Sequence, residues 1–136
     1  MGFNPDVHHR RSIRLHEYDY SQNGYYYVTI CTENFIKYFG RIQNGEMELN
    51  NIGEIVKQCW DDLPNHYGNC KLDAFVIMPN HVHGIVIIDN VIDRVGAGFK
   101  PAPTNGHLKR YGLFEIVRGF KTFSARKINI SQKLFY

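Results

Sequence analysis

The sequence predicts an α+β fold, in which an antiparallel sheet of four to five strands packs against helices. Short runs of aromatic and β-branched residues, typical of strands, lie on both sides of a segment with helical periodicity. Two pairs of these runs are joined by only two residues, as in antiparallel hairpins. A second segment with helical periodicity follows the last strand. Together these elements indicate helices layered on an antiparallel sheet.

The first strands are predicted from residue type and turn signals. Residues 25–31 are rich in aromatic and β-branched side chains and follow Gly24, which favours a strand. Residues 38–43 and 46–49 flank Asn44-Gly45, the dipeptide most typical of a two-residue hairpin turn with positive φ. We therefore expect one strand followed by a two-stranded ribbon.

Two helices are predicted from apolar residues at helical spacing. The first begins at Asn51, has Glu54 as its capping-box partner and is closed by Pro64. Its apolar stripe, Trp60 included, is expected to face the core. The second helix spans residues 111–128, and we expect close packing or a kink at its interior glycine, which costs about 1 kcal/mol of helix propensity.

Length and composition indicate one domain, residues 1–136, with a flexible Gly- and Pro-rich connector at about residues 89–107. The three cysteines are odd in number and widely spaced, which argues against a disulfide framework and predicts a reducing, cytoplasmic environment. No apolar run approaches the roughly 20 residues that a membrane helix needs, so no membrane contact is expected.

The most informative stretch consists of two apolar runs, residues 72–78 and 81–88, joined at Pro79-Asn80. The runs are short and rich in valine and isoleucine, so we expect a hairpin. Because both runs are apolar on both faces, they are predicted to be interior strands covered on both sides.

Two histidines follow the turn of this hairpin. Side chains alternate along a strand, so His81 and His83 point the same way with Cβ atoms roughly 6.6–7 Å apart. A two-residue turn places Met78 opposite His81 and Val76 opposite His83, which gives the imidazoles an apolar flank. Such a pair can bind one cation, although the same pattern is typical of partly buried histidines bonded to their neighbours.

This stretch resembles the signature of the IS200-like, or REP-associated, tyrosine transposases, a branch of the HUH endonucleases that is named for its His-hydrophobic-His motif. Similar segments occur in the same order along nearly the whole chain, at residues 11–15 (RSIRL), 18–20 (YDY), 26–32 (YYVTICT), 39–40 (FG) and 116–121 (IVRGFK). The resemblance implies a ferredoxin- or RRM-like HUH fold. It also implies metal-dependent nicking and joining of single-stranded or hairpin DNA through a 5′-phosphotyrosine.

By this resemblance His81 and His83 are the metal ligands, for Mg²⁺ or Mn²⁺. Two imidazoles suit manganese better, and a third ligand is needed. Family members continue past the position of Lys133 into a Trp-Gln-Arg-like turn and a helix that carries the nucleophilic tyrosine and a further ligand. This chain ends first, so we expect the nucleophile to be missing, with Tyr136 as the remaining candidate.

Basic residues predict where DNA phosphates bind. Residues 107–136 hold seven lysines and arginines against a single acid. The candidates for phosphate contacts, from the resemblance and from this charge, are Arg11, Arg14, Arg118 and Lys121. A solvated helix face is the alternative explanation of the basic block. A homodimer that donates elements between protomers is also left open.

Two other functions remain to be weighed. One is a non-catalytic module that binds single-stranded DNA through the same basic residues and aromatic stacking, and that does not depend on the histidines. The other is a His-based nucleotide hydrolase or transferase. Histidine-triad proteins carry a third alternating histidine where Ile85 stands here, and the two His-x-Ser/Thr motifs of 2H phosphoesterases are absent.

Overall fold

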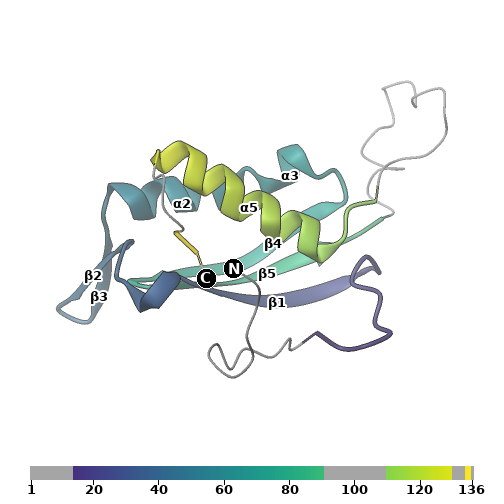
Figure 1. Cartoon of the computed structure of the whole chain (residues 1–136), viewed down its shortest axis with the longest axis horizontal. Coiled ribbons are helices and arrows are strands. Elements are labelled where there is room, and N and C mark those ends of the chain that lie inside the picture. Colours follow the sequence, from purple (N-terminus) through teal and green to yellow (C-terminus); the bar gives the residue numbers. More distant parts are fainter. Residues whose placement is uncertain (1–13, 91–109, 130–133, 136) are drawn as a thin grey trace, which may run out of the picture.

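The computed structural model describes residues 14–90, 110–129 and 134–135, which include most of the predicted elements but not residues 91–109 of the connector (Figure 1). The elements follow in the order β1 (Gly24–Cys31), the short 3-10 turn η1 (Glu33–Phe35), β2 (Gly40–Gln43), β3 (Glu46–Leu49), α2 (Asn51–Asp61), α3 (Leu63–His66), β4 (Cys70–Met78), β5 (His81–Ile88) and α5 (Leu113–Ile128). The predicted α+β class is confirmed.

The five strands are divided between two sheets in the described part of the chain, rather than forming the single sheet expected. β1, β5 and β4 make an antiparallel sheet with β5 in the centre, while β2 and β3 form a separate ribbon. β3 is followed directly by Asn50, the N-cap of α2, so the chain passes from the ribbon to the helix layer. The ribbon turn has the predicted positive φ angles, 54° at Asn44 and 78° at Gly45.

The helices lie together on one face of the three-stranded sheet (Figure 1). Alternate residues of β5 are buried beneath them, and Gly84 allows the closest approach, because a Cβ there would lie 2.5 Å from the indole ring of Trp60. Trp60 in turn packs on Phe75 and Phe120, with ring centroids 4.3 and 5.6 Å apart. The predicted core role of Trp60 is confirmed, since it is 2% exposed.

The opposite face of this sheet is open, so the prediction that the hairpin strands are covered on both sides is wrong. Tyr25 and Tyr27 of β1 are 74% and 67% exposed on this face, and Val76 of β4 is 51% exposed. β5 therefore alternates between fully buried residues and half-buried ones. The apolar character of both faces did not reveal this, because half-buried valine and isoleucine also stabilise an open sheet face.

α2 begins at Asn51 as predicted, although the residue that caps it is Asn50, whose side-chain oxygen accepts a hydrogen bond from Gly53 at 2.9 Å. Pro64 does not close this helix but lies in the first turn of α3, where a proline leaves no donor unsatisfied. The close packing expected at Gly119 is present, against the hydroxyl of Tyr67.

No helix in the described residues is both long enough and apolar enough to cross a membrane.

Candidate metal centre

The turn between β4 and β5 fixes where the two histidines lie. The register is the one predicted, with Met78 opposite His81 and Val76 opposite His83. The segment after β1 holds the turn, because both the backbone N–H and the hydroxyl of Thr32 donate to the carbonyl of Asn80 at 3.0 Å. The histidines therefore follow a turn that is tied to a second element of the fold.

The two imidazoles lie side by side on the open face of the sheet. Their ring centroids are 4.7 Å apart and their planes are inclined by 79°. Nδ1 of His81 lies 2.7 Å from the side-chain oxygen of Asn80. Because an amide oxygen only accepts hydrogen bonds, Nδ1 carries the proton and Nε2 of His81 keeps its lone pair. This is the tautomer that a metal-binding histidine needs.

His83 is held by two hydroxyl groups of β1. The hydroxyls of Tyr27 and Thr29 each lie 2.9 Å from Nδ1 of His83, and the Tyr27 ring stacks on the imidazole with an interplanar angle of 17°. A hydroxyl oxygen can accept a hydrogen bond from Nδ1, which leaves Nε2 for a further partner. Both imidazoles thus have Nδ1 engaged by the protein.

The environment favours the neutral form of His81. Partial burial, and to a lesser extent the nearby His83, lowers the pKa of His81 from its ordinary value of 6.5. A neutral imidazole is the form that binds a cation, because a protonated one has no lone pair to offer.

The pair has two of the ligands that a metal ion requires. No group of three histidine, cysteine, aspartate or glutamate side chains in residues 14–90, 110–129 and 134–135 is arranged to hold a metal. Cys31, the cross-strand neighbour of His81, does not complete such a group. Two imidazoles with apolar flanks suit a transition metal such as Mn²⁺ better than Mg²⁺, which prefers oxygen ligands.

Of the predicted basic residues, the two on α5 lie on the other side of the sheet from the histidines. Arg118 and Lys121 belong to α5, which lies across the sheet from the two imidazoles. The guanidinium of Arg14 lies 3.5 Å from the centre of the Phe114 ring, at the first turn of the same helix. Arg11 and Tyr136 lie outside the described residues.

Sequence reasoning missed three residues of the site. Asn80 was interpreted only as a turn residue, and Tyr27 only as part of the sheet, whereas both bond Nδ1 of a histidine, as does Thr29. The alternation of polar and apolar residues in β1 places Tyr27 and Thr29 on one face. The pairing of β1 with β5, which brings them to His83, cannot be derived from that alternation.

No protein-family model matches the chain. A protein of Haemophilus influenzae, described as uncharacterized, is 50% identical over 90 residues, which cover 65% of this chain and 50% of that protein. The chain therefore spans about half the length of this relative.

Proposed function

We propose that this chain provides the metal-binding part of a site that nicks and joins single-stranded or hairpin DNA, as in the IS200-like tyrosine transposases. The observation that carries the proposal is the pair His81 and His83 on one sheet face, each with Nδ1 engaged by a neighbouring side chain so that Nε2 remains available. The resemblance of several further segments in the same order supports it.

In this proposal His81 and His83 bind the metal, and neighbouring residues orient their imidazoles. Asn80, Tyr27 and Thr29 orient the imidazoles, and the neutral form of His81 is favoured by its lowered pKa. The open sheet face gives an extended strand access to both rings, because the helices lie on the other side (Figure 1). A bound Mn²⁺ or Mg²⁺ supplies Lewis acidity toward a phosphoryl oxygen.

The basic residues serve a separate part of the DNA in this proposal. Arg14, Arg118 and Lys121 lie on or against α5, and here they are assigned to a phosphate other than the one at the histidines. Charges on that side fit sequence-independent contacts with a second segment, such as the stem of a hairpin.

The test uses a fluorescent DNA hairpin with single-stranded flanks, incubated with the protein and Mn²⁺. We expect Mn²⁺-dependent binding that is lost in His81→Ala and His83→Ala and retained in His16→Ala, which removes an exposed histidine elsewhere. A covalent protein–DNA adduct on a denaturing gel would show that this chain also contains the nucleophile. DNA binding that is unchanged by both histidine substitutions would favour the alternative function, a non-catalytic DNA-binding module. No DNA binding at all would refute the proposal.

A further inference from the structure

A groove of about 300 Å³ runs along the outer edge of β4, close to the histidines. Its lining comes from three elements: Met47 and Leu49 of β3, Lys57 of α2, and Phe75, Val76 and Ile77 of β4. The volume is at the lower end of the roughly 300–1,000 Å³ typical of small-ligand sites. It is an apolar groove with one exposed cation at its side.

The groove begins one residue away from the candidate metal centre. Val76 lines the groove and is also the cross-strand partner of His83. Directly opposed residues of antiparallel strands have Cβ atoms about 4.5–5.5 Å apart. A ligand that reaches both the imidazole of His83 and the groove needs to cross only the side chain of Val76, which is 51% exposed.

The backbone of β4 adds hydrogen-bonding groups to this groove. Met78 and His81 close a two-residue turn and so form a hydrogen-bonded pair. Hydrogen-bonded and non-hydrogen-bonded pairs alternate along an antiparallel ladder, so the N–H and C=O groups of Phe75 and Ile77 point away from β5. They face the edge that the groove follows.

We propose that this groove binds one unpaired nucleobase of the DNA strand whose phosphate lies at His81 and His83. The inference rests on the proposed function and adds a base-binding subsite to it. A base is a flat apolar ring with donors and acceptors along its edge, which matches apolar walls beside outward-facing backbone groups. Lys57 is placed to contact the phosphate that follows the base.

The edge of β4 is too short to bind a peptide strand instead. A bulge interrupts the β4–β5 register between Leu72 and Phe75, and the turn begins at Pro79. The regular edge beside the groove is therefore limited to residues 75–78, whereas strands average about 5–6 residues. One base needs only two or three hydrogen bonds, so the short edge suits it better.

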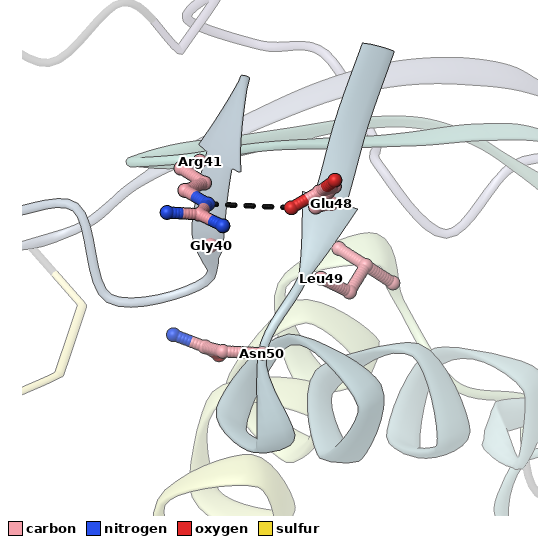
Figure 2. Close-up of a pocket in the computed structure, with 5 residues that line it drawn as sticks. All are labelled: Gly40, Arg41, Glu48, Leu49 and Asn50. Carbon is pink, nitrogen blue, oxygen red and sulfur yellow. Dashed lines mark hydrogen bonds and ion pairs between the residues drawn. The ribbon is translucent and has the colours of Figure 1, made fainter. Parts of the chain in front are cut away.

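A second hollow, of about 310 Å³, lies at the base of the ribbon and lacks these features (Figure 2). Its cation, Arg41, is paired with Glu48 at 3.2 Å. The amide of Asn50 is also engaged, since it accepts from Gly53 and donates to the carbonyl of Tyr38 at 2.8 Å. This hollow therefore offers a phosphate less positive charge than the groove beside Lys57.

The test places 2-aminopurine at successive unpaired positions of the hairpin oligonucleotide and follows its fluorescence on binding to the full chain with Mn²⁺. We expect one position to change intensity far more than its neighbours, and Leu49→Trp, which fills the groove, to abolish that change. Lys57→Gln should lower the magnitude of the slope of log K against log salt by about 0.7, the value for one phosphate of single-stranded DNA. Lys71→Gln, an exposed lysine of β4 outside the groove, is the charge-matched control.

Four outcomes would overturn the inference. A uniform fluorescence response along the strand would show that the groove binds no particular base. Equal salt slopes for Lys57→Gln and Lys71→Gln would show that Lys57 contacts no phosphate. In either case DNA binding that depends on the histidines would still support the proposed function. Loss of self-association in the groove variants, measured by sedimentation, would assign the groove to a second copy of the chain. Absence of DNA binding by the unmodified protein would end both proposals.

Discussion

The hydroxyl of Tyr27 lies 2.9 Å from Nδ1 of His83, and the two rings are stacked 5.6 Å apart at an interplanar angle of 17°. Tyr27 is 56 residues away in the sequence and reaches His83 from the neighbouring strand. The contact orients the imidazole and engages Nδ1, which leaves Nε2 as the nitrogen available to a ligand. Thr29 approaches the same nitrogen at 2.9 Å, so two hydroxyls hold one ring.

Removing both hydroxyls should weaken metal binding while leaving both histidines in place. We expect the double variant Tyr27→Phe with Thr29→Val to bind Mn²⁺ about 10- to 100-fold more weakly, the usual cost of losing the outer partner of a metal-ligating histidine. Each single variant should lose less, because the remaining hydroxyl still accepts from Nδ1. Free Mn²⁺, measured by electron paramagnetic resonance during a titration, gives the affinities.

The matched control is Tyr25→Phe, which removes a hydroxyl from the same face of β1 at a residue that is 74% exposed. It should bind Mn²⁺ like the unmodified protein. Nitrogen-15 spectra of His83 give a second measurement that needs no metal, since they report the proton on Nδ1 or Nε2. Equal Mn²⁺ affinities for the double variant and the control would contradict the role given to these hydroxyls.

The lowered pKa of His81 predicts how the free energy of unfolding depends on pH. Burial and, second, the charge of His83 lower this pKa in the folded chain below the ordinary value of 6.5. The unfolded chain therefore binds a proton more readily, so the free energy of unfolding should decrease as pH falls through 6.5 toward the folded pKa, and should be unaffected by His81 above that range. Urea unfolding in metal-free buffer at several pH values measures this.

Two comparisons isolate the contribution of His81. In His81→Gln the part of the acid-side loss that arises from this residue should be absent. In His83→Ala, the titration of His81 followed by NMR should move toward higher pH, because the smaller of its two causes has been removed. A His81 midpoint above 6.5 in the folded protein would show that the environment acts in the opposite direction.

The fold could be predicted from the sequence wherever local signals decide the structure. Asn44-Gly45 specifies its turn through backbone conformation alone. The β4–β5 hairpin, which turns at Pro79-Asn80, has the predicted register. Which strands pair is not a local property. The division into two sheets and the open face of the larger one arise from long-range pairing and packing, which no local sequence signal specifies.

The candidate metal centre also combines features that local sequence signals predict with features that they do not. His81 and His83 could be placed on one face because strand alternation requires it. The partners of His83 lie on β1, and only the β1–β5 register, with Thr29 opposite His83, brings them there. The basic residues of α5 could be predicted as phosphate contacts but not placed relative to the histidines, because charge and resemblance carry no information about which side of a sheet a helix covers.

The close approach of β5 to α2 at Gly84 gives a prediction about packing. A Cβ at this position would lie 2.5 Å from two atoms of the Trp60 ring, which is fully surrounded in the core. Gly84→Ala should therefore lower the free energy of unfolding by about 1–3 kcal/mol, as overpacking does in other cores. Gly112→Ala, where the nearest atom is 3.8 Å away, meets no such overlap and should cost less, about 0.5–1 kcal/mol, because Gly112 is the N-cap of α5 and alanine is a poorer cap than glycine. Urea unfolding with indistinguishable midpoints for the two variants would contradict this packing.

The hydroxyl of Thr32 links the end of β1 to the turn that precedes the histidines. It is buried, and its single proton is shared between the carbonyls of Ile36 and Asn80, whose oxygens lie 2.7 and 3.0 Å from Oγ1. Thr32→Val keeps the shape but removes this donor, so unfolding should become easier by about 1–3 kcal/mol. Thr32→Ser keeps the hydroxyl and loses one methyl group, which costs about 0.8 kcal/mol.

The two variants should also separate in metal affinity, because Asn80 both receives this hydrogen bond and holds Nδ1 of His81. The affinities are compared at a temperature where both variants are folded. Weaker Mn²⁺ binding in Thr32→Val than in Thr32→Ser would show that the Thr32 hydroxyl helps to position the imidazole of His81 through Asn80. Equal affinities, together with the expected difference in stability, would restrict Thr32 to holding the fold. In that case the hydrogen bond between Asn80 and His81 positions the ring without help from the Thr32 hydroxyl.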